Sequence, residues 1–278
     1  MGINENLARE ILELHTLGVD GGYTQADVTT FAKAISGWSI GGQDNEHRFA
    51  RLGLDSGKPG EFFFREVFHE PGARHLLGRS YSEDGVKQGE AILKDLALRP
   101  QTARHIATKL VRHFIADDPP PAVVKRMTTV WLDSRGHLPK VYEALFESPE
   151  AWEQPLAKFK TPADYIYSAF RALDLPLDDK RRSLQAFEAL GQRSLQPGSP
   201  AGWPDTSSDW DGSSALLKRI AWADAVAQRL GSTRNARELA PQLLGATLSD
   251  DTARAIARAE SGSQALTLLL ASPEFMRR

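Results

Sequence analysis

The sequence predicts an all-α protein, a multi-helix globular domain in which the segment around 38–81 is irregular and can hold short strands. Apolar residues recur at helical spacing along most of the chain, capping residues precede these segments, and Gly or Pro follows them. The composition, 41% hydrophobic and 25% charged, is ordinary for a globular protein. The 278 residues suit one large domain or two small ones, and we expect a single domain over 1–278.

The first two predicted helices have clear start and stop signals. Asn4 is a good N-cap, and Gly18 supplies the C-terminal stop of the first helix. Thr24 and Asp27 have the spacing of a capping box, which predicts the next helix at about 25–36.

The segment 38–81 is rich in Gly and in turn signals. Within it, "EFFFREVF" (61–68) is a candidate for a short strand, and a helix fits it nearly as well. Helical spacing then returns in four segments: 84–98, 100–116, 121–133 and 138–147.

The second half of the chain combines helices with one long loop. Helices are expected at 161–174, 213–230, 234–244, 249–259 and 262–271. The loop 195–212 is rich in Pro, Gly and Ser, and loops of this length are usually functional or disordered. It also contains Trp203 and Trp210, so we expect both rings to pack on the helical body and to order the loop.

Charged side chains lie close to the apolar face of the first helix. On a helical wheel, Glu10 falls between Leu14 and Leu17 inside the apolar arc, and His15 lies on its other flank. A buried carboxylate must be paired, protonated or bound to a metal. Three alternatives therefore stay open: a structural network around Glu10, a catalytic acid/base pair of Glu10 and Glu13, or a metal site.

Partners for Glu10 could come from the helix predicted at 100–116. Arg104, Lys109 and His113 are the candidates, and we expect Glu10 to be mostly buried against one of them. The loop "HEPGARH" (69–75) offers further His and Glu side chains at a spacing that fits no helical ligand pair. The sequence contains no nucleophile elbow, phosphate-binding loop, zinc-protease motif or dinucleotide-binding glycine motif.

The composition limits the classes of site and partner. There are no cysteines, which excludes disulfides, thiolate metal sites and cysteine nucleophiles. The net charge of −2 gives no reason to expect nucleic acid as a partner. No apolar run reaches the roughly 18 residues of a membrane span, and the first ten residues lack the basic and apolar regions of a signal peptide.

Several sequence stretches occur in an order typical of one protein family. They run from residue 3 to the terminal "SPEF" and include "NLAREILELHTLGVDGGYTQADV", "ISGW", "LALRPQTARHIATKLVRHF", "KFKTPADY", "LGQ" and "GWPD" followed by Trp210. This order resembles the family called domain of unknown function 1800. The resemblance implies a largely helical bacterial protein, commonly exported to the periplasm or cell exterior and often encoded beside a sulfatase-like protein. It implies no catalytic residue.

The resemblance also implies a further region that usually precedes the first of these stretches. We therefore expect this chain to be the C-terminal part of such a protein, with the usual cover of its first helix missing. Leu12 lies away from the other leucines of that helix and would need such a cover. We expect an exposed apolar patch there, or self-association through the first helix.

Two classes of function fit these observations. The first is a hydrolase-like enzyme acting on a polymer, with Glu10 as general acid, Glu13 as base or metal ligand, and His15 as an orienting or ligating residue. Such a site could hold a divalent metal, and Trp38, Trp203 and Trp210 would line its cleft, because aromatic faces suit sugar rings. The alternative is a non-enzymatic binding or assembly partner of a sulfatase-like protein.

Overall fold

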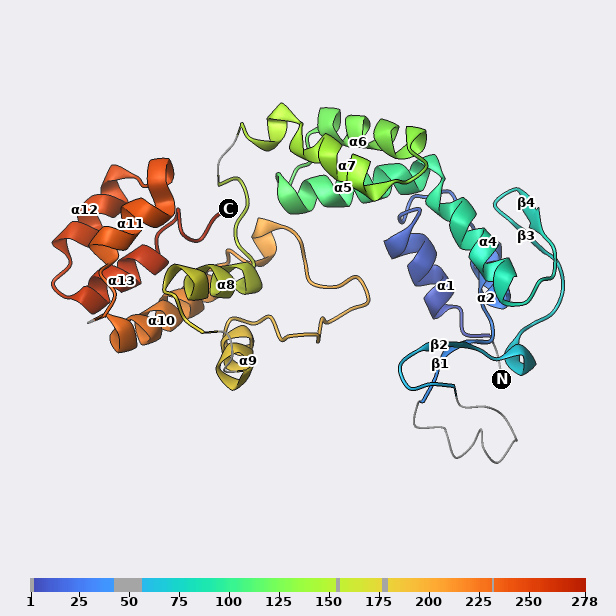
Figure 1. Ribbon diagram of the computed structural model, residues 1–278, viewed down its shortest axis with the longest axis horizontal. Coiled ribbons are helices and arrows are strands. Elements are labelled where there is room, and N and C mark those ends of the chain that lie inside the picture. Colours follow the sequence, from blue (N-terminus) through green and yellow to red (C-terminus); the bar gives the residue numbers. More distant parts are fainter. Residues whose placement is uncertain (1–2, 43–56, 154–155, 177–179, 232) are drawn as a thin grey trace. The chain divides into compact units, whose positions relative to one another are not determined.

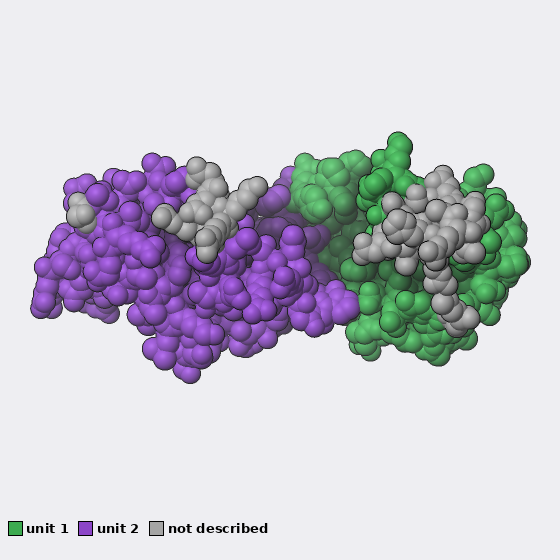
Figure 2. Space-filling view, turned by 90° about the horizontal axis from the view of Figure 1, so that it is seen from below, with its two compact units in different colours: residues 1–108, 125–144 green, residues 109–124, 145–278 purple. Residues whose placement is uncertain are grey.

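The protein is predominantly helical, which confirms the predicted fold class (Figure 1). The computed structural model describes residues 3–42, 57–153, 156–176, 180–231 and 233–278. Contacts divide the chain into two compact units (Figure 2). Unit 1 comprises residues 1–108 and 125–144, and unit 2 comprises residues 109–124 and 145–278. The single domain expected over 1–278 stays a prediction.

The elements of unit 1 combine helices with two short hairpins. They are α1 (Asn6–Glu10), the π-helix η1 (Ile11–His15), α2 (Gln25–Ala34), β1 (Trp38–Ile40), β2 (Phe62–Phe64), η2 (Glu66–Phe68), β3 (Arg74–Leu76), β4 (Arg79–Tyr81), α4 (Val86–Ala97), the first part of α5 (Pro100–Phe114), most of α6 (Pro121–Asp133) and most of α7 (Leu138–Phe146). The predicted capping box of α2 is present, with Thr24 and Asp27 bonding each other's backbone N–H.

Both hairpins lie in the segment predicted to be irregular. β1 pairs antiparallel with β2, and β3 pairs antiparallel with β4. The strand alternative for 61–68 is therefore confirmed at Phe62–Phe64, whereas Glu66–Phe68 form a 3₁₀ turn. Residues 43–56 of this segment lie outside the described residues.

The first helix differs from the wheel that predicted it. It turns Ala8 and Leu12 fully into the core, and leaves Leu7 49% exposed. The wheel assumed a constant step of about 100°, which the π turn of η1 breaks, and the small Ala8 allows close packing. The expectation that Leu12 needs an additional cover is therefore wrong, since the chain's own elements bury it. His105 Nε2 contacts the Leu14 carbonyl at 3.1 Å, which helps to satisfy the end of this helix.

Unit 2 packs a second core. Its elements are α8 (Pro162–Ala172), α9 (Lys180–Ala189), α10 (Ser213–Leu230), α11 (Ala236–Leu244), α12 (Asp250–Arg258) and α13 (Gly262–Leu270), with 3₁₀ turns η3 (Pro149–Ala151), η4 (Ser207–Asp209) and η5 (Gly245–Thr247). The predicted order of the loop 195–212 is confirmed, because Trp210 belongs to this core and Trp203 packs against it. Among the described helices of both units, none is long and apolar enough to cross a bilayer.

The C-terminal residues of unit 2 pair with the segment that precedes α8. Lys158 and Arg278 exchange backbone hydrogen bonds of 3.0 and 2.8 Å, and Lys160 N–H donates to the Met276 carbonyl at 2.9 Å. This pairing places the "KFKTPADY" segment beside "SPEF", although more than 100 residues separate them in the sequence.

Candidate functional site

The predicted catalytic residues of the first helix do not form a cluster of paired charges. Glu10 and Glu13 are half-buried and His15 is exposed. Among the described residues, none of the three side chains takes part in a hydrogen bond or an ion pair. The expected pairing of Glu10 with Arg104 is therefore absent there, and partial exposure lets water solvate the carboxylate. Lys109 and His113 belong to unit 2, so their pairing with Glu10 stays a prediction. The catalytic roles of Glu10, Glu13 and His15 also stay a prediction.

A polar network does connect the first helix to α2, through other residues. Arg9 donates to Gln25 Oε1 at 2.6 Å, and Gln25 Nε2 donates to Glu5 Oε2 at 2.6 Å. Thr29 donates to the other Glu5 oxygen at 2.7 Å. These hydrogen bonds, that of Thr29 first, lower the pKa of Glu5. The network holds two helices together, which is a structural role.

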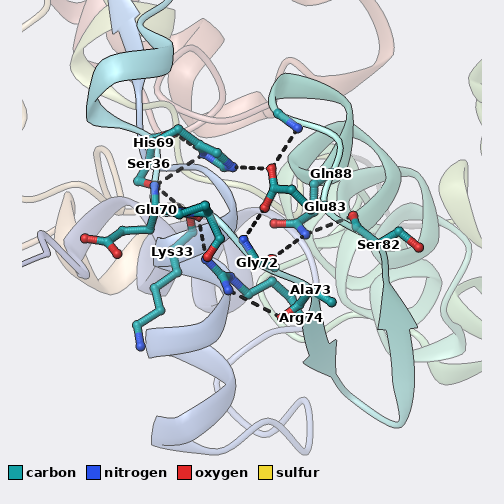
Figure 3. Close-up of polar contacts among 12 residues, drawn as sticks. Lys33, Ser36, His69, Glu70, Gly72, Ala73, Arg74, Ser82, Glu83 and Gln88 are labelled. Atoms are coloured by element: carbon teal, nitrogen blue, oxygen red, sulfur yellow. Dashed lines mark hydrogen bonds and ion pairs between the residues drawn. The ribbon is translucent and has the colours of Figure 1, made fainter.

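A buried histidine lies between a serine and a glutamate in unit 1 (Figure 3). The His69 side chain is only 5% exposed; its Nδ1 lies 2.9 Å from the Ser36 carbonyl and its Nε2 lies 3.1 Å from Glu83 Oε1. The Ser36 hydroxyl donates to the Lys33 carbonyl at 2.6 Å and accepts from Glu70 N–H at 2.7 Å. The Ser36 hydroxyl also lies 3.4 Å from His69 Nδ1, but it and both ring nitrogens already have closer partners, so this group holds loops in place.

Glu83 and Gln88 fix the two loops that flank the β3–β4 hairpin (Figure 3). The Glu83 carboxylate accepts from the backbone N–H groups of Gly72 and Gly85, and these bonds, that of Gly85 first, lower its pKa. Gln88 is 1% exposed, and its Nε2 donates to the carbonyls of Gly72, Ser82 and Tyr81 at 3.1, 3.0 and 3.4 Å. The loops are therefore anchored by the exposed Glu83 and the buried Gln88 of unit 1.

These anchored loops form one wall of a polar pocket of about 360 Å³. The lining residues come from β4, from the turn that follows it and from α4: Arg79, Ser80, Tyr81, Ser82, Asp84, Lys87, Gln88, Ala91, Lys94 and Asp95. Arg79 and the Tyr81 hydroxyl both donate to Asp95 at 2.6 Å, so this carboxylate is already neutralised. Lys87 and Lys94 are exposed and form no ion pair with any described residue.

Sequence reasoning missed this pocket, although a signal was present. Positions 87, 88, 91, 94 and 95 follow helical spacing, so their side chains share one face of α4. That face carries charged and amide groups, and the neighbouring face, with Ile92 and Leu96, enters the core. A polar helix face of this kind usually marks only a solvated surface. The pocket forms because the β3–β4 hairpin lies beside this face, and the spacing of residues in α4 does not predict that neighbour.

The three predicted substrate-binding tryptophans lie in different surroundings. Trp38 belongs to β1 in unit 1, packs edge-on against Phe62 with ring centroids 5.5 Å apart, and has a buried Nε1 without a partner among the described residues. Trp203 and Trp210 lie together in unit 2 with centroids 6.1 Å apart, and Trp210 Nε1 donates to the Pro204 carbonyl at 3.0 Å. The polar pocket is lined by none of them.

A second polar group lies in unit 2. Lys158 is 2% exposed and donates to the Asp117 carboxylate and to the Asp205 carbonyl. Burial is the largest single effect on the pKa of Asp117 and raises it. The hydrogen bonds from Lys158 and Ser207 together outweigh burial, so the pKa of Asp117 is lowered. The Asp205 carboxylate lies 3.8 Å from His113 Nδ1, with side chains 32% and 47% exposed. His113, predicted as a partner of Glu10, therefore faces a different carboxylate.

Two further cations of unit 2 are buried among aromatic rings. Lys160 donates to the Phe275 carbonyl at 2.7 Å and lies over the Phe275 ring, and burial lowers its pKa to about 8. Arg219 is 1% exposed, lies over the rings of Phe159 and Tyr165 and donates to the Lys160 carbonyl at 2.7 Å. Burial lowers the pKa of Arg219 to about 10. These contacts stabilise the core of unit 2.

Comparison with known proteins identifies the family of the chain. The described residues contain no group of three or more His, Asp or Glu side chains that could hold a metal ion, so the predicted metal site finds no ligand set there. No curated protein and no solved structure matches the sequence significantly. One family model, described as "Protein of unknown function (DUF1800)", matches residues 2–277. The chain therefore belongs to the DUF1800 family.

Proposed function

We propose that this protein binds an anionic, hydroxyl-bearing ligand, such as an acidic saccharide segment of a polymer, in the polar pocket of unit 1. One observation carries the proposal. Lys87 and Lys94 line the pocket without partners among the described residues, while Asp95 is already occupied by Arg79 and Tyr81. The pocket thus has three cations against two carboxylates, and its free positive charge favours an anion.

The remaining lining groups favour hydroxyls on the same ligand. Ser80 and Ser82 can donate or accept, and the Asp84 carboxylate can accept from a sugar hydroxyl. The cavity volume of about 360 Å³ lies within the range of small-molecule sites. The Glu83 and Gln88 bonds hold the wall in place before the ligand arrives, which lowers the entropy cost of binding.

The proposal is tested by titration calorimetry with tetragalacturonic acid as the acidic probe and cellotetraose as the neutral one. The double variant Lys87→Gln/Lys94→Gln should weaken binding of the acidic probe by about tenfold, because each lost charged contact contributes roughly 0.7 kcal/mol or more. The matched control is Lys125→Gln/Lys140→Gln, which removes the same charge from exposed positions of α6 and α7. Equal binding of both probes, or an unchanged affinity in the pocket variant, would refute the proposal.

A second candidate function is hydrolysis, and the His113–Asp205 pair favours it. Asp205 faces Nδ1 of the ring, and Nε2 has no partner among the described residues. We propose that His113 takes a proton from water through Nε2 while Asp205 orients the ring. His113→Gln and Asp205→Asn should then each remove a hydrolytic activity that Lys218→Gln, at an exposed position of α10, retains. Glu10→Gln, Glu13→Gln and His15→Gln belong in the same assay, since the roles first predicted for them are also proposals.

Three other expectations are proposals that rest on the family resemblance or on the first helix. Assembly with a sulfatase-like protein would be tested by co-purification, and export by fractionation of cells that express the native gene. Self-association through the first helix would use the exposed Leu7. Leu7→Lys should then shift sedimentation toward the monomer, and an unchanged profile at high concentration would refute it.

A further inference from the structure

A second pocket, of about 390 Å³, lies in unit 2 and is largely apolar. It is formed by the end of α8 and the residues after it, by α9 and by α10, which lie beside one another in Figure 1. Phe170, Leu175, Trp222, Val226 and Leu230 contribute its larger side chains. Neither function proposed above uses this pocket.

Small residues leave the space open. Ala186 and Ala189 of α9 line the pocket together with Ala225 of α10. Trp222 is held from behind, because its ring packs against the buried Tyr165 with centroids 5.6 Å apart. The aromatic wall of the pocket is therefore supported by the core of unit 2.

Among the described residues that line the pocket, two have polar side chains. Gln185 and Arg229 are both exposed, which places them at the edge of the pocket. Arg229 forms no ion pair or hydrogen bond with any described residue. As far as the structure describes it, the pocket thus combines an apolar interior with one free cation at its edge.

We propose that this pocket binds a single acyl chain whose carboxylate pairs with Arg229. A peptide segment is a poorer occupant, because its backbone N–H and C=O groups need partners and the lining side chains offer only Gln185 and Arg229. An acyl chain carries no such groups along its length, and its transfer from water to apolar walls is favourable. The guanidinium pairs well with a carboxylate, which selects an acid over an alcohol.

The test is a titration with decanoate and, in parallel, with decanol, followed by tryptophan fluorescence. Trp222→Phe should remove the signal, which assigns it to this pocket among the six tryptophans of the chain. Arg229→Gln should weaken decanoate binding about tenfold and leave decanol binding unchanged. Arg258→Gln, at an exposed position of α12, is the matched control and should change neither.

Filling the pocket provides the second arm. Ala225→Phe should abolish binding of both probes while thermal unfolding shows that the fold is kept, and Ala189→Leu serves if that variant does not fold. The proposal would be overturned if the pocket-filling variant still bound decanoate, or if Arg229→Gln left the affinity for decanoate unchanged. A third outcome would also overturn it: the wild type does not bind decanoate, and it self-associates in a concentration-dependent way that pocket filling abolishes. The pocket would then belong to an interface with a second copy of the chain.

Discussion

Gly89 lies in the middle of α4, where any larger residue would meet the ring of Trp38. A Cβ at this position would lie 2.6 Å from Trp38 Cζ2 and 3.1 Å from Ile35 Cγ2. Carbon atoms in contact prefer about 3.5–4.0 Å, so the ring would have to move by roughly 1 Å. Its edge-on contact with Phe62 resists that movement.

The two opposing effects of Gly89→Ala can be compared. Alanine favours a helix over glycine by about 0.8–1.0 kcal/mol, whereas overpacking costs about 1–3 kcal/mol. We expect Gly89→Ala to lower the free energy of unfolding by about 1 kcal/mol. Trp38→Phe removes the six-membered ring that carries Cζ2, so in that background Gly89→Ala should be neutral or stabilising.

Urea unfolding of the wild type, both single variants and the double variant, followed by circular dichroism, measures the coupling between the two sites. We expect a coupling of about 1–3 kcal/mol. Gly198→Ala is the control, because a Cβ there meets no atom within 4 Å, and it should be nearly neutral. Additive effects, or a Gly89→Ala variant more stable than the wild type, would refute the proposed contact and would free Trp38 for the substrate-binding role first predicted for it.

Three further predictions concern polar groups that are hydrogen-bonded within the fold. Gln88→Ala should lower the free energy of unfolding by about 1–3 kcal/mol in urea, since it leaves buried carbonyls without a donor; a neutral effect would contradict the wall described above. The pKa of Glu83 is lowered in the fold, so its contribution is present above its unfolded pKa of about 4.3 and is lost as pH falls through the folded value. Glu83→Gln should therefore make the melting temperature less dependent on pH in this acid range, and an unchanged dependence would count against it. The pKa of Lys160 is lowered to about 8 in the fold, so between about pH 8 and 10 the unfolded chain binds more protons than the folded protein. The free energy of unfolding should therefore rise with pH in this range. The Lys160→Met variant should show a smaller rise than the wild type.

The sequence predicted the features of the fold that depend on neighbouring residues. The capping box at Thr24 and Asp27 needs only a spacing of three, and it is present. The loop tryptophans follow from a similar local argument, because two large rings in a polar loop have area to bury. Helix α9 was not predicted, although Ala186, Phe187 and Leu190 have a helical spacing and are buried.

The partners of charged groups were predicted less well, for a physical reason. Glu83 is held mainly by backbone N–H groups of Gly72 and Gly85, and every residue except proline offers such a group. The π turn of η1 changes which face of the first helix is buried, and no spacing of apolar residues announces it. Side-chain patterns therefore predicted the helices well, and predicted the contacts between distant segments poorly.

Several polar groups that line the two pockets still have hydrogen-bonding capacity for a ligand, whereas those of the buried networks already have partners within the fold. His69 and Lys158 are the kind of residue that carries catalysis, yet each is buried and its nitrogens already contact acceptors of the protein. A group whose hydrogen-bonding capacity is used within the fold can act on a ligand only after those bonds break, which costs stability. Ligand binding by Lys87, Lys94 and Arg229 has no such cost, because these side chains line cavities and have no partners among the described residues. The binding proposed at these two pockets therefore breaks no ion pair or hydrogen bond between these three side chains and the described residues.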